Sequence, residues 1–115
     1  MSDAALATVE AVVQRGGDAD DVLRAVVAAL HEDAGYAWAG ILFVEDGSLS
    51  LGPEAGTPGT AGRTAVPVVW DGEPVAELAV EGAAPDDGPF LARVAELVSD
   101  YCLVGWDTGG EEWSP

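Results

Sequence analysis

Two carboxylates within one apolar segment are the residues of this sequence whose spacing most suggests chemistry. Glu77 and Glu81 lie four residues apart in the segment 73–81. Because side chains alternate between the two sides of a strand, both would point the same way if this segment forms a strand. Two carboxylates on one surface can perform acid–base catalysis or hold a cation. They can equally be ordinary solvated side chains, and we favour that interpretation because no third polar group clearly converges on them.

Nucleophilic and metal chemistry find little support elsewhere in the chain. Cys102 is the one cysteine, so an internal disulfide and a cluster of cysteine ligands are excluded. It lies among apolar residues at helical spacing, which is typical of a small buried side chain. His31, the one histidine, lies near the end of a predicted helix, where a partial positive charge is favourable. We therefore predict no catalytic residue, no metal site and no cofactor.

Charge limits the partners that this chain can take. It has 115 residues, with 21 acidic and 4 basic side chains and a formal net charge of −17. Such a charge repels phosphate groups, so we expect neither nucleic-acid nor membrane binding. No apolar run reaches the ~20 residues that span a bilayer. The acidic N-terminus lacks the basic start of a signal peptide, and this predicts a cytoplasmic protein.

Three helices are predicted from apolar residues at helical spacing. The first covers residues 3–15 and ends at two glycines, and the second begins at Asp18 or Asp20 and ends before Gly35. The third covers residues 89–104, with Asp86 or Asp87 as its N-cap. Each helix has one apolar side, so each needs an apolar surface on which to pack.

Two hairpins provide that surface. Segments 37–45 and 48–52 flank an Asp-Gly turn, and segments 64–70 and 73–81 flank another. Pro67 cannot donate to a ladder, so its strand is expected at the edge of the sheet. One face of the sheet is apolar and should carry the helices: Ile41, Phe43, Val66, Val68, Trp70, Leu78 and Val80. The opposite, mixed face contains Trp38, Gly40, Leu42, Ala65, Pro67, Val69, Glu77, Ala79 and Glu81.

The order of these elements predicts a single α+β domain over residues 1–115. It has an antiparallel sheet of about four strands, with two N-terminal helices and one C-terminal helix on one face. The segments GYAWAGILFVEDGSLSLGPEAGTP and VPVVWDGEPVAELAVEG resemble the GAF domain family. They are most similar to the stand-alone bacterial GAF proteins that reduce free methionine-R-sulfoxide. The most specific parts are Trp38-x-Gly40, the Leu-Gly-Pro of 51–53 and the Val-Pro-Val of the third strand.

The resemblance implies a GAF-like fold with a ligand site on the mixed face, where Trp38 corresponds to the tryptophan that binds the substrate. At the family's other pocket positions, Leu42 stands for a tyrosine, Arg63 for a glutamate and Glu81 for an aspartate. The reductases carry their cysteines between the two hairpins, where this chain is short and has none. We therefore expect no reductase activity. The candidate ligand-binding residues are Trp38, Leu42, Arg63, Glu77 and Glu81.

The expected function is that of a non-catalytic module in protein association or regulation, acting as a homodimer. The alternative is a small-molecule sensor that binds its ligand around Trp38, and an enzyme is the least expected. The resemblance implies pairing of terminal helices, for which the apolar candidates are Leu6, Val9, Val13, Val94, Val98 and Tyr101. The tail, residues 105–115, carries Trp106 and Trp113. It either packs on the open sheet face or is frayed.

Overall fold

The computed structural model describes residues 3–45, 47–59 and 62–105. Its elements are α1 (Asp3–Arg15), α2 (Ala19–Glu32), β1 (Trp38–Glu45), β2 (Ser48–Gly56), β3 (Arg63–Trp70), β4 (Glu73–Glu81), α3 (Gly88–Val98) and the 3-10 helix η1 (Ser99–Gly105). The predicted order of helices and hairpins is therefore confirmed. Two boundaries differ by more than one residue: β2 continues beyond residue 52 to Gly56, and the last α-helix ends at Val98 and continues as η1.

A bulge explains why β2 is longer than expected. Gly40 pairs with Glu54 and Leu42 pairs with Leu51, so Ile41 faces two residues of β2. Such a bulge accommodates a proline, which has no N–H for the ladder. Pro53 therefore interrupts the pairing at one point without ending the strand. The part of β2 beyond it contributes to the site described below.

The sheet is antiparallel throughout and has the strand order β2-β1-β4-β3. The strand β3 lies at one edge, which confirms the position predicted from Pro67. The two strands in the middle, β1 and β4, come from different hairpins. Because β1 and β4 are direct neighbours, residues 38 and 81 lie side by side although they are far apart in the chain.

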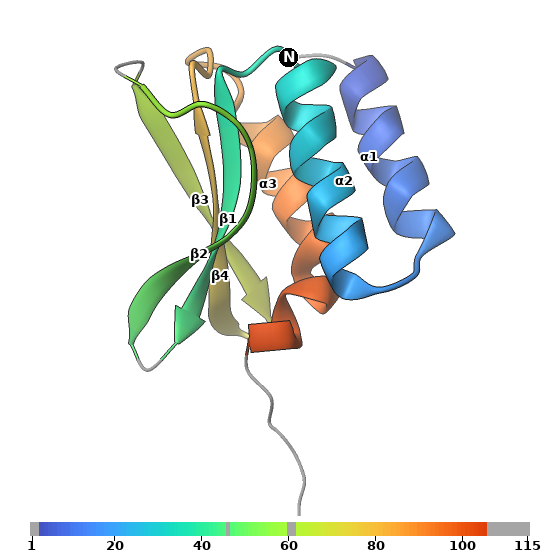
Figure 1. The fold of residues 1–115 in the computed structure, drawn as a ribbon, viewed down its shortest axis with the longest axis vertical. Coiled ribbons are helices and arrows are strands. Elements are labelled where there is room, and N and C mark those ends of the chain that lie inside the picture. Colours follow the sequence, from blue (N-terminus) through green and yellow to red (C-terminus); the bar gives the residue numbers. More distant parts are fainter. Residues whose placement is uncertain (1–2, 46, 60–61, 106–115) are drawn as a thin grey trace, which may run out of the picture.

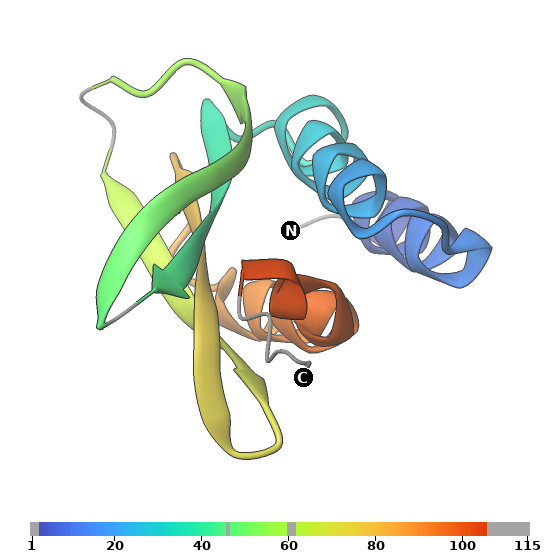
Figure 2. The same ribbon diagram turned by 60° about the horizontal axis from the view of Figure 1, so that its bottom comes forward.

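All three helices lie on the same side of the sheet (Figures 1 and 2). Helix α2 packs on β1 and β2, helix α3 packs on β3, and α1 packs on α2 and α3. The core between the layers includes Ile41, Val68, Leu78 and Val80, which are fully buried as predicted. Val66 and Phe43 pack against this core. Trp70 was expected there too but is 42 % exposed, because it lies at the end of β3 beside the hairpin turn.

Two glycines and a buried aspartate shape the chain next to the helices. The chain reverses after α1 at Gly16 and Gly17, whose φ angles of 68° and 118° favour glycine. Asp87 is the N-cap of α3, but its side chain makes no capping bond. Its Oδ2 instead accepts hydrogen bonds from the Tyr36 hydroxyl at 2.9 Å and the Ala84 N–H at 3.0 Å. This buried contact ties the loop before α3 to the segment that enters β1.

Candidate functional site

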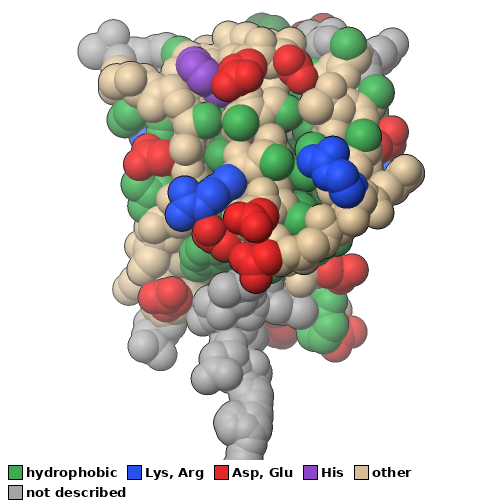
Figure 3. Space-filling view, turned by 45° about the vertical axis from the view of Figure 1, so that its right-hand side comes forward, with side chains coloured by type: hydrophobic (Ala, Val, Ile, Leu, Met, Phe, Trp, Pro, Cys, Tyr) green, Lys and Arg blue, Asp and Glu red, His purple; other side chains and the backbone are tan. Residues whose placement is uncertain are grey.

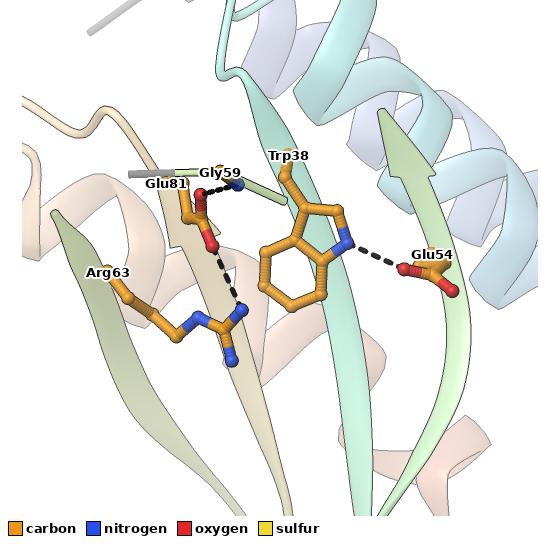
Figure 4. Close-up of polar contacts among 5 residues, drawn as sticks. All are labelled: Trp38, Glu54, Gly59, Arg63 and Glu81. Carbon is orange, nitrogen blue, oxygen red and sulfur yellow. Dashed lines mark hydrogen bonds and ion pairs between the residues drawn. The ribbon is translucent and has the colours of Figure 1, made fainter. Parts of the chain in front are cut away.

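One row of paired residues crosses the open face of the sheet, the face opposite the helices. Gly56 of β2 pairs with Trp38 of β1, Trp38 pairs with Glu81 of β4, and Glu81 pairs with Arg63 of β3. Figure 4 shows the side chains of Glu81 and Arg63 beside the indole ring of Trp38. The antiparallel register of three strands therefore brings together an aromatic ring, a carboxylate and a guanidinium.

Trp38 is the centre of this site and is only 1 % exposed. Its Nε1 donates a hydrogen bond of 2.7 Å to Oε1 of Glu54, on the neighbouring strand β2. The ring lies over Gly40, where an added Cβ would come within 2.5 Å of the Trp38 Cζ2 atom. The Trp-x-Gly motif therefore has a steric cause, since only glycine leaves room for the ring to lie flat on the sheet.

Glu81 is a nearly buried carboxylate, 3 % exposed, with a partner for each oxygen. Its Oε1 accepts a hydrogen bond from the Gly59 N–H at 2.8 Å. Its Oε2 accepts one from Nη2 of Arg63 at 2.9 Å. The Gly59 N–H, and after it Arg63, hold the pKa of Glu81 below its usual range. Our expectation that Glu81 is a solvated side chain is therefore wrong.

Arg63 closes the site from the edge strand. Its guanidinium carbon lies 4.3 Å from the centre of the Trp38 ring, while its side chain remains 48 % exposed. This distance is within the range in which a cation is attracted to the face of an aromatic ring. The guanidinium thus interacts with the ring and with Glu81 at once. The positive charge at position 63 is satisfied by neighbours within the same row.

The other two predicted site residues lie elsewhere on the same face. Leu42 and Glu77 are paired with each other, and Glu77 is paired with Pro67, in a row further toward the hairpin turns. The side chain of Glu77 makes no hydrogen bond or ion pair with the residues that the structure describes. The two carboxylates that share one face therefore do not act on a common group. Trp38, Arg63 and Glu81 do come together.

Sequence reasoning missed two members of the site, Glu54 and Gly59. Glu54 follows Pro53, and both lie beyond residue 52, the predicted end of the second strand. The bulge keeps it in the sheet and beside Trp38. Gly59 lies in the connector between the hairpins and contributes a backbone N–H, for which no side-chain pattern exists. The one feature of the sequence that could have indicated Glu54 is its place directly after the Leu-Gly-Pro of residues 51–53.

The open face has a different character near the hairpin turns. Leu49 and Leu51 of β2 and Val69 of β3 are 46, 53 and 47 % exposed. Leu42 and Val44 of β1 lie between them and are half-buried. Within residues 3–45, 47–59 and 62–105, no helix packs on this face. We refer to Leu42, Val44, Leu49, Leu51 and Val69 as the apolar patch.

The single cysteine is separated from this site by the sheet. Cys102 is fully buried in the core on the helix side, and burial raises the pKa of its thiol to about 12. His31 lies near the end of α2 and close to β2, since a Cβ added at Gly56 would come within 2.9 Å of its Nδ1. Its Nδ1 lies 2.8 Å from the Tyr36 carbonyl oxygen, which can only accept, so Nδ1 carries the hydrogen. The Cys102 thiol therefore has the sheet between it and any ligand on Trp38.

The described residues form neither a metal-binding cluster nor a membrane-spanning helix. No three side chains of the metal-binding types come together there. None of the described helices has the length and apolar character needed to cross a bilayer.

The helix residues predicted to form a dimer differ in exposure. Val9, Val94 and Val98 are fully buried within the chain, so they have no surface to offer a second copy. That part of the prediction is wrong, because α1 uses its apolar side against α2 and α3. Leu6, Val13 and Tyr101 are half-buried, and the Tyr101 hydroxyl donates to the Val13 carbonyl at 3.2 Å. Trp106 and Trp113, the predicted cover, lie outside the described residues.

Comparisons with known proteins place the fold. No family profile and no curated protein matches the sequence. Among solved structures, the free methionine-R-sulfoxide reductase from Neisseria meningitidis has a TM-score of 0.72 at 19 % identity, over 95 % of this chain and 96 % of that one. The GAF domain of the Acinetobacter phosphoenolpyruvate-protein phosphotransferase has a TM-score of 0.72 at 14 % identity, over 95 % and 98 %. The type II free methionine-R-sulfoxide reductase from Thermoplasma acidophilum has a TM-score of 0.65 at 18 % identity, over 80 % and 95 %. The chain thus has a GAF-like fold.

Proposed function

We propose that this chain is a non-catalytic GAF-like module that acts through protein association or regulation. The proposal rests on the way in which the open-face site is filled. Arg63 lies over the Trp38 ring and pairs with the buried Glu81, so the site is closed by the chain's own side chain. Since the structures with a similar fold include both reductases and a GAF domain, the fold alone does not decide between them.

The position of the thiol supports the absence of catalysis. A reaction that proceeds through cysteine needs a thiolate within reach of the substrate. Cys102 is fully buried on the helix side of the sheet, and Trp38 lies on the open face. A substrate on the Trp38 ring would have the whole sheet between its sulfur atom and the Cys102 thiol.

Association is proposed to take place through α1. Its outward side carries the exposed residues Ala4, Ala7 and Ala11, and Leu6 and Val13 beside them are half-buried. Small side chains allow two helices to approach closely, and the flanking Leu6 and Val13 would then be fully buried. Figure 3 views the helix side, where hydrophobic side chains alternate with acidic and arginine side chains. A symmetric pair of α1 helices would form the homodimer.

Native mass tests this proposal. Light scattering at micromolar concentration should give the mass of two chains for the wild type. Ala7→Arg places a large charged side chain on the outward side of α1 and should give the mass of one chain. Ser48→Arg, which adds the same charge at the exposed first residue of β2, is the matched control and should remain a dimer. A wild type with the mass of one chain would overturn the proposed homodimer.

A small-molecule sensor is the second candidate function. The observation that favours it is an exposed cation on two buried partners: Arg63 is 48 % exposed, whereas Trp38 and Glu81 are almost fully buried. A ligand around Trp38 could therefore exchange with one side chain while the sheet stays intact. A ligand that raises the melting temperature of the wild type would support this function.

The tail is proposed to cover the apolar patch. The described chain ends at Gly105, in η1, which contacts β1, β3 and β4 at the end of the sheet that holds the hairpin turns (Figure 1). Residues 106–115 include Trp106 and Trp113. At ~3.3 Å per residue an extended segment of this length can reach around that end to the apolar patch. Its indole rings would then replace water on Leu49 and Leu51.

A further inference from the structure

The site around Trp38 has fixed walls and a movable occupant. The walls are the Trp38 ring and the Glu81 carboxylate, and each is held by a partner other than Arg63. Trp38 donates to Glu54 on β2, and Glu81 accepts from the Gly59 N–H. Figure 4 shows Arg63 reaching these two walls from the outer strand. The walls would therefore keep their positions if the guanidinium left.

Arg63 can leave without a change in the backbone. It is the first residue of an edge strand, and its side chain is 48 % exposed. Rotation about its side-chain bonds would carry the guanidinium from the Trp38 ring into water. What remains is a carboxylate that is 3 % exposed in the complete site and has lost its one ion pair among the described residues. A buried charge without its counter-ion is costly, so the empty site favours any cation that fits.

The walls select the kind of cation. A guanidinium is planar, so it can stack on the indole while donating in its own plane to a carboxylate. An ammonium group is a compact and strongly hydrated charge, which stacks less well. A sodium ion has no flat surface to stack on the indole and no hydrogen to donate to the carboxylate. The arrangement of Trp38 and Glu81 therefore matches a planar organic cation better than the other common cations.

We propose that Trp38 and Glu81 form a receptor for a guanidinium group, that Arg63 is its internal occupant, and that a free guanidinium compound binds by replacing the Arg63 side chain. This rests on the second candidate function, the sensor, and is independent of the proposed homodimer. The internal occupant lowers the apparent affinity of the wild type, because only the fraction of molecules with Arg63 displaced can bind. The site is thus specific for one cation class and is held closed until that cation is abundant.

The test removes the Arg63 side chain by substitution and supplies a free guanidinium ion in its place. Arg63→Ala, labelled with ¹⁵N, is titrated with guanidinium chloride at millimolar concentrations, well below those that unfold proteins. We expect saturable shifts of the Trp38 indole N–H and the Gly59 amide resonances, together with recovery of most of the melting temperature that the substitution lost. The wild type should bind guanidinium at least about tenfold more weakly, because it must first displace Arg63.

Three controls separate this site from general salt effects. Sodium chloride and urea at the same concentrations should not shift the two resonances. The double variant Arg63→Ala/Glu81→Gln should lose the saturable response, because the neutral amide no longer attracts a cation. Arg24→Ala removes an exposed ion pair with Asp20 on α2, and guanidinium should not restore its melting temperature.

The result that would overturn the proposal is a folded Arg63→Ala variant whose Trp38 and Gly59 resonances do not saturate with guanidinium. An equal response in the double variant would overturn it as well. If Arg63→Ala does not fold, Arg63→Lys retains a charge in the site and replaces it in the titration. Guanidinium should then bind more tightly than to the wild type, and equal affinity would contradict the proposal. Native mass is unaffected by either result, so a failure here leaves the proposed homodimer standing.

Discussion

The Arg63 guanidinium carbon lies 4.3 Å from the centre of the Trp38 ring, across the strand that separates them. Between their strands, Glu81 pairs with Arg63 on one side and with Trp38 on the other in the register of the sheet. Arg63, Glu81 and Trp38 therefore act as one unit. The carboxylate of Glu81 balances the charge of the Arg63 guanidinium, and the indole of Trp38 packs against the flat surface of that guanidinium.

Gly40→Ala should disturb the position of Trp38. The new methyl group would come within 2.5 Å of Cζ2 and 2.8 Å of Cη2 of the ring, so the ring must move away from the sheet. We expect a loss of about 1–3 kcal/mol in the free energy of unfolding, the usual cost of an overpacked position. Urea unfolding measures it. Gly88→Ala is the control, since an added Cβ there meets nothing within 4 Å; an equal loss in both variants would refute the steric role of Gly40.

The contacts of Glu81 with the Gly59 N–H and with Arg63 should make the free energy of unfolding depend on pH in the acid range. The folded pKa of Glu81 is lowered, first by the Gly59 N–H and then by Arg63, so its contribution is fully present above the unfolded pKa of about 4.3. That contribution is lost as the pH falls through the lower folded pKa. The stability difference between wild type and Glu81→Gln, measured by urea unfolding, should therefore shrink toward low pH. A difference for Glu81→Gln that stays constant as the pH falls would contradict the assignment.

Cys102 should be inert in the folded protein. Burial raises the pKa of the Cys102 thiol to about 12, so the thiol is protonated at pH 8, and the side chain is out of reach of solvent. Iodoacetamide should modify it only after unfolding in urea. The protein should also not reduce free methionine-R-sulfoxide in the presence of a thiol reductant. Reduction by the wild type that disappears in Cys102→Ala would show that the chain is an enzyme after all.

Much of this structure could be anticipated from the sequence, because the elements follow from local patterns. The Asp-Gly turns and the alternation of apolar residues predicted both hairpins, and Pro67 predicted the edge strand. The site was harder to predict, since it depends on the pairing of β1 with β4, which connects distant residues. Glu81 appeared solvated because no local pattern indicates that Arg63 lies beside it, and only the resemblance to GAF domains grouped the two residues. Glu54 was missed because Pro53 normally ends a strand, and only the bulge keeps the pairing intact.

The residues predicted to form a homodimer show a similar limit of prediction from the sequence. Apolar spacing on α1 and α3 correctly identified one side of each helix, but spacing does not say what that side contacts. Val9 and Val94 are used within the chain because α1 forms a further layer on α2 and α3. The outward side of α1 therefore carries Ala4, Ala7 and Ala11 together with the polar Gln14, and the apolar pattern did not distinguish these small side chains.

Removing residues 106–115 tests the tail as a cover of the apolar patch. If the tail lies there, its removal should expose Leu49 and Leu51 further, lower the melting temperature and increase the fluorescence of a dye that binds apolar surfaces. The same deletion in a Leu51→Asp background should have a smaller effect, because the patch would already be weakened. Unchanged melting temperature and dye binding after the deletion would rule out the tail as the cover.

The central claim is that Arg63 and Glu81 act as one unit over Trp38. A double-mutant cycle of Arg63→Ala and Glu81→Gln, followed by urea unfolding at neutral pH, tests it most directly. Each single variant should lose stability, and the double variant should lose clearly less than the sum, because Glu81→Gln removes the carboxylate that Arg63→Ala leaves without its counter-ion. Strictly additive losses would contradict the claim.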